Sequence, residues 1–217
     1  FKSQDKIFYN YGTKNNFGIY LKNTNTVGKN DNKYKSDPNV DFKSIYEVNT
    51  SLPMVQQDKK YISSFTPKVS LRVNPGKMEN YSNTDRMINA DNIFNIDRLS
   101  LGDTFESGKS LTYGINYRNE NLEYSEKYFE LSLASVLRNS VEIKIPKKTT
   151  LNKKKSNIFG SMNYSTSELL NLEYDFSIDN DLSTFDYNAL GAEISVNNFV
   201  TKFNFIKESN VMGNENS

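Results

Sequence analysis

Three charged residues in one polar stretch, Arg98, Asp103 and Glu106, have the types and spacing that could support chemistry. Paired carboxylates can serve as general acid and general base, or can bind a cation. No nucleophile or activated base accompanies them, so the sequence favours a structural role over catalysis. Arg98 can donate two hydrogen bonds to a single carboxylate, either Asp103 or Glu106. We therefore predict a loop that is folded into the structure.

Other catalytic and metal-binding chemistries find little support in this sequence. The chain has no Cys and no His, which excludes disulfides, Cys/His zinc sites, Cys nucleophiles and Ser-His-Asp triads. Asp179 to Asp181 resembles the start of a calcium loop, but it lacks the Gly at position six and the Glu at position twelve. A polar turn explains it better. We predict no catalytic residue, no metal site and no cofactor.

The elements that would position the charged loop are strands. Apolar residues occupy every second position of the segment 170–178, and polar residues occupy the positions between them. The apolar set is Leu170, Leu172, Tyr174, Phe176 and Ile178. A period of two over nine residues is typical of a strand with one apolar and one wet face.

The same alternation recurs along the chain and predicts about ten strands. They fall near residues 5–12, 16–23, 41–54, 60–74, 109–119, 125–138, 156–165, 169–179, 183–196 and 199–207. Two connections are long, near 24–40 and 75–108, and the others are short or moderate. This organisation predicts an all-β fold, the wall of an antiparallel up-and-down transmembrane β-barrel. In a wide barrel the loop with Arg98 would partly fill the lumen or contact a plug subunit, with Phe94, Ile96 and Leu99 beneath it.

Composition agrees with a barrel that exposes one strand face to water. The mean hydropathy of −0.70 and the 36% hydrophobic content are low for a globular core. The formal net charge of +1 gives no overall field for nucleic acid. No apolar run reaches the roughly 18 residues of a transmembrane helix. A lysine-rich run between 147 and 155 suits a solvated loop, or alternatively a contact with anionic lipid head groups or saccharide phosphates.

Local signals set the strand register and its irregularities. Asn197-Asn198 can form a two-residue hairpin turn, which would pair Val196 with Phe199. The apolar phase changes between Ala189 and Leu190, so we expect a β-bulge near Gly191. Pro53 and Pro67 fall inside strand patterns, where we expect bulges or an unpaired edge because proline lacks the ladder donor.

One stretch of the chain carries a resemblance to a known family. The residues that match the family pattern are Asn92, Phe94, Arg98, Gly102, Asp103, Glu106 and Gly108, followed by Tyr113 and Gly114 in the next strand. This stretch resembles the barrel domain of the LptD family, the lipopolysaccharide-assembly proteins of the Gram-negative outer membrane. The resemblance covers most of residues 40–208, although only 92–117 is specific.

The resemblance implies a function and a set of partners. It implies a non-enzymatic role in lipopolysaccharide transport at the outer membrane, with a plug lipoprotein (LptE), an LptA-type periplasmic bridge and the barrel-assembly machinery as partners. Residues 1–217 would all belong to one barrel domain. The family's N-terminal periplasmic domain and its first and last barrel strands would lie outside this chain, which we expect to be an internal part of a longer protein.

The polar strand face is the predicted functional surface. The residues expected to face the lumen are Arg72, Thr112, Asn116, Arg118, Glu173, Asp175 and Lys202. Both charge signs occur, so this wall would be hydrated without strong ionic selectivity. Such side chains can bind the sugars and phosphates of a lipopolysaccharide head group, or they can merely solvate the lumen.

Two alternative functions remain open from the sequence. Another outer-membrane barrel, a porin or a TonB-dependent receptor, would share every feature except the 92–117 stretch. A soluble extracellular adhesin would instead bury the apolar rows between two stacked sheets.

Overall fold

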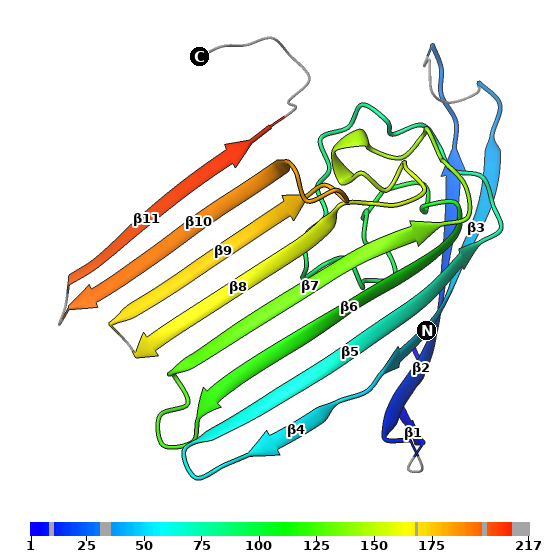
Figure 1. Cartoon of the computed structure of the whole chain (residues 1–217). Helices are drawn as coiled ribbons and strands as arrows, with labels where there is room; N and C mark the ends of the chain where they lie inside the picture. Colours follow the sequence, from blue (N-terminus) through cyan, green and yellow to red (C-terminus); the bar gives the residue numbers. More distant parts are fainter. Residues whose placement is uncertain (9–10, 31–35, 168, 197–198, 210–217) are drawn as a thin grey trace.

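A computed structural model describes residues 1–8, 11–30, 36–167, 169–196 and 199–209. The described residues form one antiparallel sheet of eleven strands in the order β1-β2-β3-β5-β6-β7-β8-β9-β10-β11, with β4 paired beside β5 (Figure 1). The strands are β1 (Lys6–Phe8), β2 (Thr13–Thr26), β3 (Asn39–Ser51), β4 (Met54–Gln57), β5 (Tyr61–Asn74), β6 (Gly108–Asn121), β7 (Tyr128–Arg138), β8 (Ile158–Ser167), β9 (Leu170–Ile178), β10 (Phe185–Val196) and β11 (Phe199–Glu208). The all-β, up-and-down prediction is confirmed, and the sheet is open, as in part of a barrel.

Helical structure is nearly absent from the described residues. A single 3₁₀ turn, η1 (Lys147–Thr149), interrupts the connection between β7 and β8. No helix in the part of the chain that the structure describes is long and apolar enough to cross a membrane.

A proline divides one predicted strand into two. The segment expected at 41–54 ends as β3 at Ser51, and β4 begins at Met54, with Pro53 between them. Pro67 lies in β5 opposite this break, because β3 pairs with the residues after Pro67 and β4 pairs with the residues before it. The two prolines therefore occupy one gap in the sheet, where the missing ladder donors cost least.

Each strand has one apolar and one polar face, and the pairing keeps the two faces separate. Leu71 lies opposite Leu111, and Leu111 lies opposite Leu137. These three residues are all exposed on the outer face of the sheet. One position away, Ser70 lies opposite Thr112 on the inner face, and both are buried. No second sheet covers the outer face within the described residues. The described residues therefore do not form the two stacked sheets expected of an adhesin.

The last hairpin has the predicted register. Val196 pairs with Phe199 and Ala192 with Phe203, while Asn197-Asn198 lies outside the described residues. The predicted bulge near Gly191 is wrong: Gly191 pairs regularly with Glu173 and Asn204. The irregularity falls between Phe185 and Tyr187. Phe185 faces outward against the Phe176 ring, 5.9 Å away, so the strand changes phase five residues earlier than the apolar pattern suggested.

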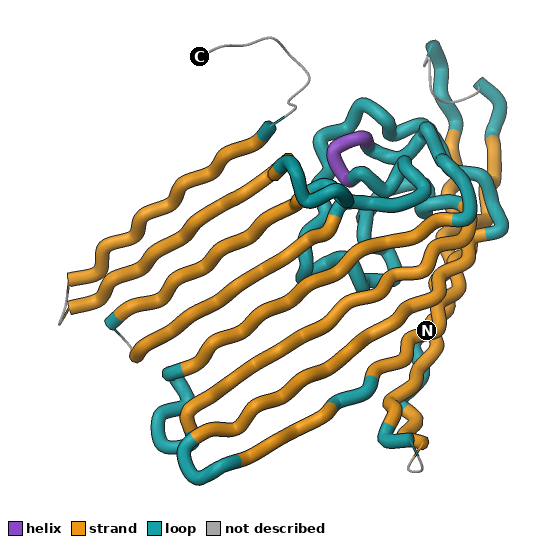
Figure 2. The backbone as a smooth tube through the Cα atoms, in the orientation of Figure 1, coloured by secondary structure: helices purple, strands orange, loops and turns teal. Residues whose placement is uncertain are grey.

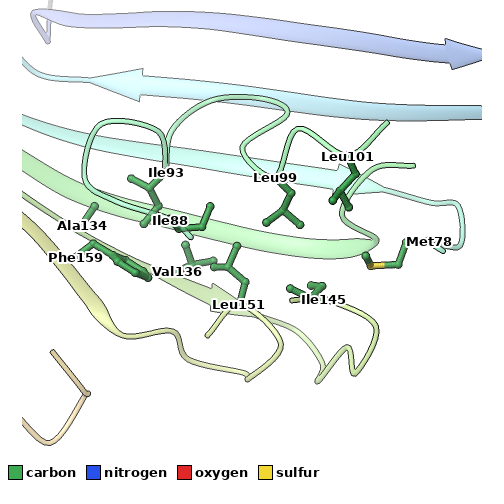
Figure 3. Packing of buried hydrophobic residues seen from close by; sticks show 10 residues of the cluster. All are labelled: Met78, Ile88, Ile93, Leu99, Leu101, Ala134, Val136, Ile145, Leu151 and Phe159. Carbon is green, nitrogen blue, oxygen red and sulfur yellow. The ribbon is translucent and has the colours of Figure 1, made fainter. Parts of the chain in front are cut away.

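The buried core lies between the inner face of the sheet and two long loops. Figure 2 shows these loops in teal, gathered at one end of the strands. One loop comprises residues 75–107, which we call the inserted loop, and the other comprises residues 139–157. The cluster contains Met78, Ile88, Ile93, Leu99 and Leu101 from the inserted loop, Ile145 and Leu151 from the second loop, and Ala134, Val136 and Phe159 from β7 and β8 (Figure 3).

The second loop differs from the prediction of a moderate linker with a solvated lysine run. Ile145 and Leu151 are fully buried, so its backbone packs into the core. Lys147 and Lys153 are exposed, as predicted, while Lys148 lies 2.7 Å from Asp85 and 2.8 Å from Glu208. These hydrogen bonds raise the pKa of Lys148 above its usual value. The connection predicted near 24–40 is shorter than expected, since β2 extends to Thr26 and β3 begins at Asn39.

Candidate luminal site

The inserted loop spans the inner face of six strands, β2, β3, β5, β6, β7 and β8. Its hydrogen bonds and ion pairs reach Lys22 of β2, Lys43 of β3, Arg72 and Asn74 of β5, Ser110 and Thr112 of β6 and Arg138 of β7, while its apolar residues pack on Phe159 of β8. The contacts with all six strands fix the position of the inserted loop against the sheet.

A buried ion cluster centred on Glu106 holds the loop to the wall. Arg98 Nε donates to Glu106 Oε2 at 2.7 Å and Arg98 Nη2 donates to Oε1 at 2.6 Å, which is a bidentate pair. Arg98 also donates to Thr112 Oγ1 at 2.9 Å and to Ser110 Oγ at 3.2 Å. Arg138 of β7 donates to the same carboxylate from the other side. We call these residues the Glu106 cluster.

The electrostatics of the cluster keep Glu106 charged. Burial by itself would raise the pKa of Glu106, but Arg98, Arg138 and Arg72 outweigh it and hold the pKa at about 2. Buried charges are tolerated only when they are paired and hydrogen-bonded. Glu106 therefore acts as a fixed anion between arginines of the loop and the wall, and not as a group poised to exchange protons.

Arg72 extends the buried ion network toward β3. Its Nη2 donates to Glu47 Oε1 at 2.7 Å and to the backbone carbonyl of Asn95 at 2.7 Å. Ser70 Oγ donates to the same Glu47 oxygen. Arg72 thus joins the wall to the inserted loop through a charge pair and a backbone contact, although its Nε and Nη1 have no hydrogen-bond partner within the described residues.

Apolar residues that the sequence analysis did not single out anchor the same loop. Ile93, Leu101 and Phe105 are almost completely buried. Lys22 of β2 lies 4.3 Å from the centre of the Phe105 ring and donates to the carbonyls of Leu101 and Thr104. These residues follow no helical or strand period, so their only sequence signal is a high apolar content within a polar stretch.

The structure places the remaining family-motif residues in three different settings. Asn92 exchanges hydrogen bonds with Asn89, each side-chain oxygen accepting from the other residue's backbone N–H. Asp103 accepts a hydrogen bond from Tyr81 Oη, so the carboxylate paired with Arg98 is that of Glu106. Gly108 begins β6 with φ of +84°, a conformation that favours glycine.

The apolar residues expected beneath Arg98 do not all lie there. Leu99 is buried in the core cluster and Phe94 packs against the edge of that cluster. Ile96 instead lies over Gly18 of β2, where an added Cβ would come within 3.0 Å of its Cδ1. Gly102 has open space around its Cα, so packing does not explain a glycine there.

The predicted lumen-facing residues divide into two groups. Arg72 and Thr112 are buried beneath the inserted loop, in what we call the covered wall. The other five share the inner face but lie beyond the loop, in what we call the open wall: Asn116, Arg118, Glu173, Asp175 and Lys202. The structure therefore does not bring the seven residues into one site.

Two charged residues of the open wall, Arg118 and Lys202, form ion pairs on the inner face. Arg118 donates to Glu120 at 2.9 Å and to Glu130 at 2.8 Å, and its guanidinium lies 4.1 Å from the centre of the Tyr128 ring. Lys202 pairs with Glu193 at 2.7 Å. The described residues contain no group of three or more acidic, His or Cys side chains placed to hold a metal ion.

Comparison with known protein families assigns the chain to one of them. The family model LPS transport system D (LptD) matches residues 10–217, nearly the whole chain. The chain belongs to the LptD family. Membership in LptD implies lipopolysaccharide transport and an outer-membrane protein, and it favours this function over a general porin, a TonB-dependent receptor or an adhesin. A comparison with curated proteins finds no match.

Proposed function

We propose that this chain is a stretch of barrel wall and luminal loop through which lipopolysaccharide passes to the outer leaflet. The observation that carries the proposal is the division of one sheet into an apolar outer face and a polar inner face. Residues 1–217 belong to one barrel domain in this proposal. Its inner face both holds a fixed loop and presents a free polar surface.

The outer face is suited to hydrocarbon. Large apolar side chains such as Val69, Leu71 and Tyr113 remain exposed on it. A patch of this extent on a soluble protein would favour association. In an outer-membrane barrel the same side chains form the lipid-facing band, and aromatic residues gather at its borders.

The distribution of connections suggests which end of the sheet faces the cell exterior. The connection between β2 and β3, the inserted loop and the second loop all join strands at one end of the sheet (Figure 1). The opposite end has short turns, such as the one between β4 and β5 (Figure 1). Bacterial barrels have short periplasmic turns and longer extracellular loops. We infer that the inserted loop enters the lumen from the extracellular side.

The motif residues and the open wall have separate roles in this proposal. The motif residues hold the inserted loop in the lumen; they are Asn92, Phe94, Arg98, Gly102, Asp103, Glu106 and Gly108. The residues of the open wall, among them Asn116, Arg118, Glu173, Asp175 and Lys202, contact the hydrated head group as it passes. No chemistry is performed on the cargo, and the driving energy comes from outside this chain.

The family relationship supplies the proposed partners. A plug lipoprotein of the LptE type would contact the luminal surface, an LptA-type bridge would deliver lipopolysaccharide, and the barrel-assembly machinery would insert the barrel. None of these contacts involves nucleic acid or a cofactor.

Photo-crosslinking tests the proposed function directly. A photoreactive amino acid at Arg118, Glu173 or Asp175 of the full-length protein should capture lipopolysaccharide in cells. The matched control is Tyr174, which lies between two of these positions in β9 but faces outward, so that it should capture bilayer lipid whether or not new lipopolysaccharide is being transported. Failure of all three luminal positions to capture lipopolysaccharide, in a protein that still supports growth, would contradict the proposal.

A further inference from the structure

A hollow in the open wall has the features of a binding site for one part of the cargo. It crosses β7 to β11, has a volume of about 310 Å³ and is open on the inner face of the sheet. The polar side chains that line it are Tyr128, Asn163, Asn171, Glu173, Glu193, Lys202 and Asn204. This volume is at the lower end of the range for small-molecule sites, about 300–1,000 Å³.

Gly191 creates the floor of this hollow. It lies between Glu173 on β9 and Asn204 on β11, in a row that continues to Asn163 on β8. A Cβ at Gly191 would meet its nearest neighbours at 3.5 Å, which is ordinary contact. Glycine is therefore not required at this position by packing.

Two other strand glycines differ from Gly191 because they have no room for a side chain. A Cβ at Gly160 would lie 2.1 Å from the Phe176 ring, and a Cβ at Gly114 would lie 2.4 Å from the carbonyl oxygen of Leu133. Those two glycines are needed for close packing of the sheet. The effect of Gly191 is instead to leave room above the strand.

The polar groups around Gly191 are free to bind a ligand. Within the described residues, the side chains of Asn163, Asn171, Glu173 and Asn204 make no hydrogen bond to another protein group, in contrast to the paired side chains of the Glu106 cluster. Amides and carboxylates around a shallow hollow are suited to the closely spaced hydroxyl groups of a sugar, because an amide can both donate and accept hydrogen bonds and a carboxylate can accept several.

The charge of the hollow discriminates among the parts of the cargo. Glu173 and Glu193 outnumber Lys202, and Lys202 is already paired with Glu193. A phosphate would meet net negative charge, and an acyl chain would leave the amides and carboxylates without partners. We infer that the Gly191 hollow binds uncharged, hydroxyl-rich sugar units of the lipopolysaccharide head group. This inference rests on the proposed function and adds to it the chemical class that this surface recognises.

The test uses the full-length protein with a photoreactive residue at Asn204, on the rim of the hollow, or at Asn116 of β6 as a luminal reference. Two cargoes are compared, lipopolysaccharide with its sugar core and lipopolysaccharide truncated to the phosphorylated lipid. The Asn204 probe should capture the first and not the second. Gly191→Val should lower capture at Asn204 about tenfold, since several hydrogen bonds are lost, and should leave capture at Asn116 unchanged.

Two further variants control for charge and for folding. Glu173→Gln removes the charge but keeps one acceptor oxygen and adds an N–H donor, both of which can bond to a sugar hydroxyl, so capture at Asn204 should persist. Ala192→Val adds bulk to the neighbouring residue, on the outer face, and should have no effect. Heat-modifiable migration on gels verifies that each variant has assembled.

The outcomes separate the inference from the proposed function. Capture at Asn116 combined with no capture at Asn204, or with capture that Gly191→Val does not reduce, overturns the inference and leaves the proposed function standing. Stronger capture of the truncated lipid at Asn204, or loss of capture in Glu173→Gln, overturns the assignment to uncharged sugars. Absence of capture at both positions in an active protein contradicts the proposed function itself.

Discussion

The covered wall and the open wall are formed by strands with the same alternation of polar and apolar residues. They differ in whether the polar residues are buried and bonded or exposed. In the covered wall, Arg72 and Arg138 are buried and donate to groups of the inserted loop, Arg72 to the carbonyl of Asn95 and Arg138 to the carboxylate of Glu106. In the open wall, Glu173 and Asn204 remain exposed. Strand periodicity therefore determines which face a residue occupies, while the inserted loop determines whether that residue stabilises the fold or remains available for a ligand.

The largest expected effect comes from removing the carboxylate of Glu106, which holds the inserted loop to the covered wall. Glu106→Ala would leave Arg98 and Arg138 buried without their partner, at a cost of about 3–5 kcal/mol. Hydrogen exchange of the full-length protein should then show the amides of Ile93, Asn95 and Ser100, which are bonded within the loop, exchanging about a hundredfold faster or more.

The matched variant lies in the open wall. Glu173→Ala removes an exposed carboxylate of the same type and should change stability by no more than about 0.5 kcal/mol. Equal effects of the two variants on exchange in the inserted loop would remove the distinction between the two walls.

The covered wall should also respond to acid. The pKa of Glu106 is about 2 in the folded protein, below the value of about 4.3 in an unfolded chain. A depressed folded-state pKa contributes stability that is fully present above about pH 5 and is lost as the pH falls toward 2, on the order of 3 kcal/mol in total.

The acid effect is measured as a difference between two proteins. Protection of the inserted loop from exchange should fall over that pH window in the wild type, more steeply than in Glu106→Gln, which carries no carboxylate at this position. Identical pH profiles for the two proteins would show that the pKa of Glu106 is the same in the folded and the unfolded state.

The smallest expected effect on stability is the difference between substitutions at two glycines. Gly160→Ala places a methyl group against the Phe176 ring and should cost about 1–3 kcal/mol, because the ring must move. Gly191→Ala meets only ordinary contacts and should stay within about 0.5 kcal/mol. Thermal unfolding of the assembled barrel in detergent measures both, and a larger cost at Gly191 would contradict the description of its surroundings.

Several of these features could be predicted from the sequence because they depend on local pattern. The alternation in 170–178 was enough to predict β9 and the face of each of its residues. The pairing of Arg98 with a carboxylate was predictable in kind, but the partner is Glu106, which also accepts from Arg138 of β7, more than thirty residues away, while Asp103 accepts from Tyr81. No local signal specifies such a contact.

Other features were beyond sequence reasoning for the same physical reason. The buried side chains of Met78 and Phe105 follow no period, since they fill spaces formed by distant strands and loops. The sequence pattern predicted the phase change near Gly191, but it lies between Phe185 and Tyr187. The prediction was wrong because Tyr187 and Ala189 continue the apolar alternation that begins at Phe185, although they lie on the inner face. The hollow at Gly191 appears only once Glu173 and Asn204 are known to flank it.

Site-directed spin labelling along β9 of the full-length protein in bilayers tests the central claim most directly. Labels at Leu172, Tyr174 and Phe176 should collide mainly with oxygen dissolved in the lipid, and labels at Asn171, Glu173 and Asp175 mainly with a water-soluble nickel reagent. This alternation is expected at every residue from Asn171 to Phe176. Equal accessibility of both sets to the water-soluble reagent would contradict it, because the apolar rows would then face water or protein and not the membrane.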